Sequence, residues 1–226
     1  LVSPTFLMLK KKFEKLIKIN NKRYEAHLNL SNIFSLEGDV NKANDVLQNF
    51  LKNVEENLAI INTIGINLLN SKKYGELEKH INKFINKFES HILYFVKGYL
   101  LNKNEQIKES EDYFVKSINT KKNFWNGYDL LFKQYEKQSR LKDFKTLLYK
   151  AKTIFNNNIK LLYYESLYLF RKKEYQQSLS ILTNVHLEKN FTQNQNKKDI
   201  ANYYHLLSRV YEKLGLFNES YNFAIK

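Results

Sequence analysis

The stretch YHLLSRVYEKLGLFNESYNF, residues 204–223, decides the fold. Offsets of three, four and seven residues place the side chains of Tyr204, Leu207 and Tyr211 on one face of a helix. Gly215 then interrupts the series, and a second apolar series begins two residues later. Glycine suits the left-handed residue that ends a helix, so the stretch predicts two helices joined by a short turn.

The same pattern recurs along most of the chain at a nearly constant interval. When Ala201 is taken as the first place of the last window, earlier windows begin at Tyr24, Leu58, His91, Trp125 and Ile159. The intervals between successive windows are 34, 33, 34, 34 and 42 residues. A fixed period in this range is typical of stacked copies of one supersecondary unit. The turns between the two helices are expected at 37–39, 71–73, 103–105, 138–140, 172–174 and 214–216.

The eighth place of most windows holds a small residue. It is occupied by Ser31, Gly65, Gly98, Ser166 and Ser208. A small residue where two helices touch lets their axes approach closely, so this place is expected to face the second helix of the same pair. The fourth window has Phe132 there, opposite Phe144. We expect a wider crossing or a local distortion in that unit.

Taken together, the windows resemble the tetratricopeptide repeat from Tyr24 to the end of the chain. The resemblance is carried by Tyr204, Leu207, Ser208, Tyr211, Gly215, Phe217 and Ser220, and by their counterparts upstream. The copies depart from the family pattern at its closing proline, which is replaced by Glu55, Glu89, Lys122, Asn156 and Asn190. The resemblance implies an all-α fold, a right-handed α-solenoid of antiparallel helix hairpins.

We expect a single array over residues 1–226. Its parts are the second helix of a partial repeat at 1–23, repeats at 24–57, 58–90, 91–124, 125–158 and 159–200, and an incomplete last repeat at 201–226. The one longer interval predicts an inserted polar loop near 187–199. Ser3 is expected to cap the first helix, and Pro4 suits its first turn. Neither end resembles a polar cap, which favours a fragment of a longer protein or ends that dock on another surface.

Charge and composition limit the classes of partner and compartment. The chain has 37 Lys and Arg against 23 Asp and Glu, a formal net charge of +14. This charge suits acidic partners, nucleic acid or anionic membranes, but the many Lys, Asn, Ile, Phe and Tyr residues also fit an AT-rich coding sequence. Cysteine is absent, which excludes disulfides and thiolate metal sites. No apolar window is long enough to span a membrane, and we expect a cytoplasmic protein.

The motifs of catalytic chemistry are not found in the sequence. The six glycines are scattered singly, so no glycine-rich phosphate loop is present. The five histidines show no metal-ligand spacing, and no nucleophile elbow surrounds a serine. We therefore expect this chain not to be an enzyme and to hold neither a metal nor a cofactor.

The remaining possibility is binding on the concave surface, which the first helices of a solenoid line. The second, fifth, ninth and twelfth places of each window should point there. The candidate partner-binding residues are Asn62, Phe95, Tyr99, Asp129, Lys133, Tyr163, His205 and Arg209. Exposed aromatic residues at these places predict a groove for a peptide or a partner helix. The alternative is that Phe95, Tyr99, Tyr163 and Phe170 pack against neighbouring helices.

The leading prediction is a non-catalytic protein–protein interaction scaffold with a protein or peptide partner. Some tetratricopeptide proteins bind a C-terminal carboxylate with a Lys at the fifth place. Leu28 stands at this place in the first window, so this carboxylate-binding site is absent. The first alternative rests on a resemblance of the last repeat to the one that precedes the catalytic domain of bacterial tetratricopeptide–sulfotransferase proteins. It implies the helical N-terminal region of an enzyme whose catalytic domain is not in this chain.

The second alternative is an RNA-binding helical repeat, which the net charge favours. The expected concave places are only weakly basic, so nucleic acid is not the expected partner. The sequence decides neither the identity of the partner nor the oligomeric state.

Overall fold

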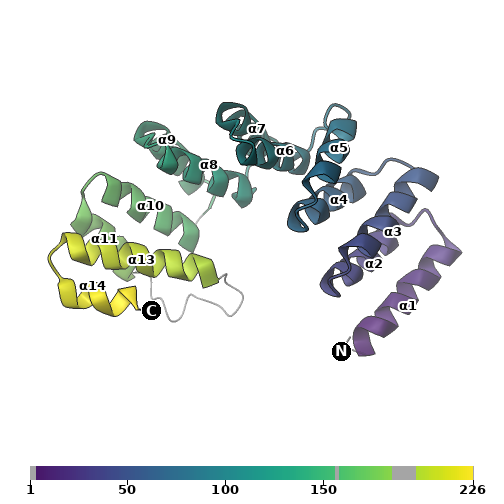
Figure 1. Cartoon of the computed structure of the whole chain (residues 1–226), viewed down its shortest axis with the longest axis horizontal. Helices are drawn as coiled ribbons and strands as arrows, with labels where there is room; N and C mark the ends of the chain where they lie inside the picture. The colour runs from purple at the N-terminus through teal and green to yellow at the C-terminus, as the bar shows by residue number, and fades with distance from the viewer. Residues whose placement is uncertain (1–3, 156–157, 185–196, 226) are drawn as a thin grey trace. The chain divides into compact units, whose positions relative to one another are not determined.

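The computed structural model describes residues 4–155, 158–184 and 197–225, and these residues form α-helices joined by short turns, with no strand (Figure 1). The helices are α1 (Pro4–Ile19), α2 (Tyr24–Leu36), α3 (Val40–Asn53), α4 (Leu58–Asn70), α5 (Tyr74–Phe84), α6 (His91–Lys103), α7 (Ile107–Thr120), α8 (Trp125–Lys137), α9 (Leu141–Lys152), α10 (Ile159–Arg171), α11 (Tyr175–Asn184), α13 (Lys197–Lys213) and α14 (Phe217–Ala224). Five of the expected windows begin at the first residue of a helix.

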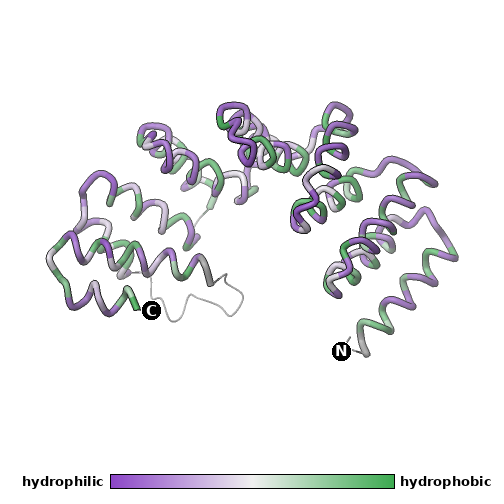
Figure 2. The backbone as a smooth tube through the Cα atoms, viewed as in Figure 1, coloured by the Kyte–Doolittle hydropathy of each residue, from purple (hydrophilic) through white to green (hydrophobic). Residues whose placement is uncertain are grey.

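The chain divides into two compact units, residues 1–127 and 128–226, and the boundary falls inside α8. In the first unit α2 pairs with α3, α4 with α5 and α6 with α7, and each hairpin packs on the next. In the second unit α10 pairs with α11 and α13 with α14. Hydrophobic residues recur at intervals along the helices and alternate with hydrophilic ones (Figure 2). This periodicity gives each helix a face that it buries against its neighbours.

The six turns within the described hairpins share one geometry. The third-last residue of the first helix accepts a backbone hydrogen bond from the third residue of the turn, as from Asp39 N to Phe34 O at 2.8 Å. This bond defines the Schellman motif, whose central residue adopts a positive φ. The central residues are Gly38, Lys72, Glu105, Ser139, Lys173 and Gly215. Five turns lie where the sequence predicts them, and the third lies at 104–106, one residue later than expected.

The small residues at the eighth place face the second helix of their own hairpin, as predicted. Ser178 Oγ on α11 donates to the carbonyl oxygen of Ser166 on α10 at 2.9 Å. Ser208 Oγ on α13 donates to the carbonyl oxygen of Ser220 on α14 at the same distance. A side chain larger than serine at these places would push the two helices apart.

The fourth repeat fills this position with aromatic rings. Phe132 and Phe144 are both buried, and their ring centroids are 4.9 Å apart. Tyr164 from α10 stacks on Phe132 with 4.3 Å between the centroids. The three rings occupy space that the other repeats close with a small residue. Whether the helices also cross at a wider distance stays a prediction.

The inserted loop predicted near 187–199 extends too far at its C-terminal end. Residues 197–199 belong to α13, which begins at Lys197, one helical turn before the last window. Asp199 lies in the first turn of this helix, where the helix dipole stabilises a carboxylate. It also forms an ion pair with Lys160 of α10, with 2.8 Å between Nζ and Oδ2. The rest of the expected loop and the expected cap Ser3 lie outside the described residues.

His80 on α5 is a polar group at the edge of the first unit's core. Its Nε2 hydrogen-bonds the carbonyl oxygen of Ile61 at 2.8 Å, and its ring packs on Phe84. Burial lowers the pKa of His80, and the positive charge of Lys83 lowers it further, although the hydrogen bond to Ile61 opposes both effects. The folded chain therefore favours neutral His80 more than the unfolded chain does.

This shift predicts a loss of stability on the acid side. Because the folded pKa lies below the unfolded value, the stabilisation is complete above about pH 6.5 and is lost as the pH falls through the folded pKa. We expect His80→Gln, whose amide can still donate to Ile61, to lose less unfolding free energy than the wild type between about pH 7 and pH 5. Urea unfolding at both pH values measures the difference. An equal loss in the two proteins would contradict the role given to His80.

Candidate functional site

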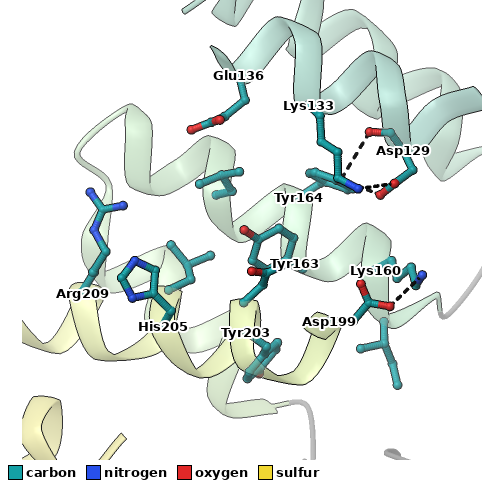
Figure 3. A pocket seen from close by; sticks show the side chains of 14 residues that line it. Asp129, Lys133, Glu136, Lys160, Tyr163, Tyr164, Asp199, Tyr203, His205 and Arg209 are labelled. Atoms are coloured by element: carbon teal, nitrogen blue, oxygen red, sulfur yellow. Dashed lines mark hydrogen bonds and ion pairs between the residues drawn. The ribbon is translucent and has the colours of Figure 1, made fainter. Parts of the chain in front are cut away.

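Three first helices of the second unit, α8, α10 and α13, enclose a pocket of about 160 Å³ (Figure 3). It is lined by Asp129, Lys133, Glu136, Ile159, Lys160, Tyr163, Tyr164, Leu167, Asp199, Asn202, Tyr203, His205, Leu206 and Arg209. All of these residues belong to residues 128–226, so the pocket lies within one compact unit. Its walls are the helix faces that the repeat pattern assigns to the concave surface.

Helical spacing brings these side chains to the pocket in rows. Each helix contributes residues three, four or seven positions apart, which share one face. The rows are Asp129, Lys133 and Glu136 on α8, Lys160, Tyr163 and Leu167 on α10, and Asn202, His205 and Arg209 on α13. The pocket is therefore a consequence of stacking three helices in the same register.

The lining of the pocket includes apolar and aromatic side chains. Leu167 and Leu206 line it and are buried, and Tyr163 is half-buried between the α8 and α13 side chains (Figure 3). Burial raises the pKa of Tyr163, and the negative charge of Glu136 raises it further. Tyr163 therefore stays a neutral phenol and presents both a ring and a hydroxyl to the pocket.

The carboxylates of the pocket are already paired. Asp129 accepts hydrogen bonds from the Tyr164 hydroxyl at 2.6 Å and from Lys133 Nζ. Burial, followed by the charge of Asp129, raises the pKa of Tyr164 well above its usual value, so this phenol keeps its proton. Glu136 forms an ion pair with Arg171, and Asp199 pairs with Lys160. None of the three carboxylates is left as a free negative charge.

Arg209 on α13 differs from the other cations of the pocket. Its guanidinium carbon Cζ lies 4.7 Å from the ring centroid of Phe170, and it forms no ion pair with any residue that the structure describes. His205, one turn earlier on the same face, is exposed. Figure 3 shows both side chains on the same side of the pocket. This side therefore carries a guanidinium that forms no ion pair with a described carboxylate, although Glu136 lies on the same side of the pocket (Figure 3).

Five of the eight candidate residues lie together in this pocket: Asp129, Lys133, Tyr163, His205 and Arg209. The other three lie in the first unit. Asn62 Oδ1 accepts a hydrogen bond from Ser90 Oγ at 2.7 Å, and Tyr99 is half-buried. Burial raises the pKa of Tyr99, and neighbouring Tyr74 raises it further.

The prediction that Phe95 binds a partner is wrong, because its side chain is buried. It is only 7% exposed, and its ring lies against Phe124 at 5.2 Å and Phe114 at 6.0 Å between centroids. Its place in the window is concave, but these two aromatic neighbours cover it. The packing alternative therefore holds for Phe95, and also for Phe170, which is buried beneath Arg209.

The list of candidate residues missed several residues of the pocket, above all Lys160, Tyr164 and Asp199. Lys160 stands at the second place of its window, which the pattern does assign to the concave surface. Tyr164 stands at the sixth place of its window, next to the expected fifth place. Asp199 precedes the last window and reaches the pocket only because α13 begins a turn early. A carboxylate just before an apolar helical series is a known sign of a helix start, and it is the one signal that pointed to Asp199.

Two other kinds of site were not found within residues 4–155, 158–184 and 197–225. No helix there has the length and apolar character that crossing a lipid bilayer requires. No group of three or more His, Asp or Glu side chains is placed to hold a metal ion in this part of the chain.

No family model and no curated protein matches the chain. Solved structures do match it. A chain of the APC/C hetero-tetramer Cut9-Hcn1 has a TM-score of 0.70 at 16% identity, and the match covers 96% of this chain and 42% of that one. A tetratricopeptide repeat protein from Parabacteroides merdae has a TM-score of 0.63 at 13% identity, with 96% and 84% covered. PilW, a type IV pilus biogenesis factor, has a TM-score of 0.56 at 17% identity, with 96% and 82% covered.

At these identities the likeness shows the fold. The chain is an all-α solenoid of helix hairpins, as the period and the turns predict. It spans less than half the length of the similar chain in the Cut9-Hcn1 hetero-tetramer. The resemblance to sulfotransferase-associated repeats is not supported by these structures and stays a prediction.

Proposed function

We propose that this chain, which has the fold of tetratricopeptide repeat proteins, is a non-catalytic interaction scaffold that binds a segment of a partner protein in the pocket of α8, α10 and α13. The observation that carries the proposal is the pocket itself. Its lining combines the apolar side chains of Leu167 and Leu206 and the ring of Tyr163 with charged side chains of α8, α10 and α13. A lining that combines aromatic, apolar and charged side chains is typical of surfaces that recognise proteins.

The size of the pocket favours side chains over a small molecule. Its 160 Å³ is below the roughly 300–1,000 Å³ of usual small-molecule sites. It can hold one or two side chains of an extended segment or of a partner helix. The rows of polar residues on α8 and α13 would then contact the flanking parts of that segment.

The charges of the pocket favour a protein segment over nucleic acid. Asp129, Glu136 and Asp199 line it together with three cations, of which Lys133 and Lys160 are already paired with carboxylates. A polyanion binds where several free cations neutralise its phosphates. A single free arginine beside three carboxylates does not meet that requirement.

One of the similar structures supports a role in assembly. It is a chain of the APC/C hetero-tetramer Cut9-Hcn1, which is a complex of several chains. The likeness shows only the fold, so it supports a partner protein in general and not that complex. The specific place of binding rests on the pocket.

Tyr163→Ala should weaken the binding of a partner segment by about tenfold or more, because a central tyrosine is a frequent hot spot of protein interfaces. Short peptides isolated from a random display library on the full chain serve as probes, and fluorescence polarisation measures their affinity. Since Tyr163 is half-buried and lines a pocket, the variant should keep its helical circular dichroism.

The matched control is Tyr149→Ala on α9, because the Tyr149 side chain is 61% exposed and lies outside the pocket. It should leave peptide affinity unchanged. Isolated peptides that bind Tyr163→Ala and the wild type equally would place the binding surface elsewhere. A library that yields no binding peptide would overturn the proposal.

A further inference from the structure

We infer that α1 docks on the surface of an anionic lipid bilayer through the side of the helix that carries Lys11, Lys12, Lys15 and Lys18. This side is the outer face of α1. The helix belongs to residues 1–127, whereas the pocket belongs to residues 128–226, so the inference goes beyond the proposed function and does not depend on it.

The side of α1 opposite its outer face packs on the core of the first unit, where α1 lies beside α2 (Figure 1). Phe13 and Ile17 pack against the cluster that contains Phe34. Lys10 also lies on this side, with its Nζ 3.5 Å from Glu37 Oε2 and 4.2 Å from the centroid of the Phe34 ring. These contacts hold α1 on the unit and leave its outer face at the surface.

Four lysines form a positive strip along the outer face. Offsets of three, four and seven residues separate Lys11, Lys15 and Lys18 and place them on one side of the helix, and Lys12 lies beside them. All four are exposed, and none forms an ion pair with a residue that the structure describes. Glu14, which borders the strip, is the one acidic residue of α1. The outer face therefore carries a strong excess of positive charge.

Large apolar side chains accompany these lysines. Met8 lies four residues before Lys12, so it shares the outer face, and Leu7 borders it. Ile19 lies four residues after Lys15 and shares the face as well. The exposed fractions are 52% for Leu7, 64% for Met8 and 71% for Ile19. Exposed apolar side chains at both ends of a basic strip are typical of helices that lie on a lipid surface.

An anionic bilayer matches both features of the outer face. Its headgroups attract basic side chains, and a strip of four lysines on one helix is large enough for this attraction to hold a protein at the membrane. The apolar layer beneath the headgroups accepts the apolar side chains of an interfacial helix. The lysine stems are apolar too, so their methylene groups can lie deeper than the ammonium groups.

Nucleic acid matches the outer face less well. Proteins hold single strands with cations that follow the phosphates and with aromatic side chains that stack on the bases. The two aromatic residues of α1, Phe6 and Phe13, are half-buried and lie on the opposite side of the helix. A phosphate backbone also offers no apolar surface to Leu7, Met8 and Ile19.

Co-sedimentation of the full chain with lipid vesicles tests the inference. We expect binding to vesicles of equal parts phosphatidylcholine and phosphatidylglycerol, and no binding to vesicles of phosphatidylcholine alone. The affinity should fall as the salt concentration rises from about 0.05 M to about 0.5 M, because the added ions screen the lysine charges.

Lys11→Gln combined with Lys15→Gln should weaken binding to the anionic vesicles by about tenfold or more, because each lysine near the membrane contributes to the attraction. The matched control is Lys79→Gln combined with Lys83→Gln on α5. These two lysines are exposed, have the same spacing and lie in the same unit, so the control removes the same charge from another surface. It should weaken binding by less than about threefold.

Leu7→Gln combined with Met8→Gln should weaken binding to the anionic vesicles by about fivefold or more, because apolar area that enters the interface adds to binding. Glutamine is a good helix former, so α1 should keep its helical circular dichroism. Leu36→Gln on α2 is the matched control, since its side chain is 73% exposed and lies outside α1. It should leave vesicle binding unchanged.

Failure to bind the anionic vesicles, equal binding to both kinds of vesicle, or equal affinity of the two lysine variants would overturn the inference. Without vesicle binding, loss of poly(U) RNA binding in the Lys11 and Lys15 variant would assign the outer face to nucleic acid instead. Loss of a dimer in that variant, measured by sedimentation velocity, would assign it to a second copy of the chain. The peptide experiment on Tyr163 is decided separately, because Tyr163 lies in the other unit.

Discussion

Phe132→Ala should lower the free energy of unfolding by about 3–5 kcal/mol, the usual effect of removing a fully buried phenylalanine. Phe132 has no exposed surface, and its ring contacts Phe144 and Tyr164 with 4.9 and 4.3 Å between centroids. Alanine would remove both ring contacts and leave a cavity that two rigid neighbours cannot close. Urea unfolding followed by circular dichroism measures the loss.

Two further variants test the reason for this effect. Phe132→Ser installs the small residue that most other repeats have at this place, but it should also destabilise the chain, because Phe144 and Tyr164 are arranged around the missing ring. Tyr149→Ala, on an exposed part of α9, should change stability by less than about 0.5 kcal/mol. If Phe132→Ser left the free energy of unfolding unchanged, the stabilising role given to the cluster of Phe132, Phe144 and Tyr164 would be contradicted.

Gly98→Ala should destabilise the chain by about 1–3 kcal/mol, the range of overpacking in a filled core. A Cβ atom on Gly98 would lie 2.8 Å from two carbons of the Phe114 ring and 3.2 Å from the carbonyl oxygen of Ser110. Both obstacles belong to α7, the second helix of the same hairpin. The clash outweighs the gain of about 1 kcal/mol that alanine normally brings to a helix.

The same substitution on a neighbouring helix should have the opposite effect on stability. A Cβ atom on Gly75 of α5 would meet no described part of a neighbouring element within 4 Å, so Gly75→Ala should stabilise the chain by about 0.5 kcal/mol. Thermal unfolding of the two variants gives the comparison. Stabilisation by both substitutions would show that α6 and α7 do not approach as closely as described.

The sequence was sufficient for the local features of the fold. The starts of the first helices and five of six turns follow from apolar periodicity and from short polar turns, which depend on residues close together in the chain. The start of α13 was not predicted, because the apolar pattern of the last window does not mark a helix start at Lys197. Helix ends depend on capping and on contacts such as the one between Lys160 and Asp199, which lie in different helix hairpins.

The candidate site was predictable to the extent that it depends on helix register. Asp129, Tyr163 and Arg209 meet because equivalent places of stacked repeats share a face. Phe95 occupies an equivalent place, but Phe114 and Phe124 cover it. Coverage by other side chains, and the pairing that leaves Arg209 alone among the cations of the pocket, depend on distances between repeats and leave no trace in the spacing of one window.

Binding of a partner segment in the pocket of α8, α10 and α13 is tested most directly by NMR titration of the full chain, labelled at its leucine methyl groups, with an isolated peptide. We predict that the methyl signals of Leu167 and Leu206, which line the pocket, shift on binding, while that of Leu147 on α9 does not. Shifts at Leu147 with unchanged signals of Leu167 and Leu206 would contradict the proposed site.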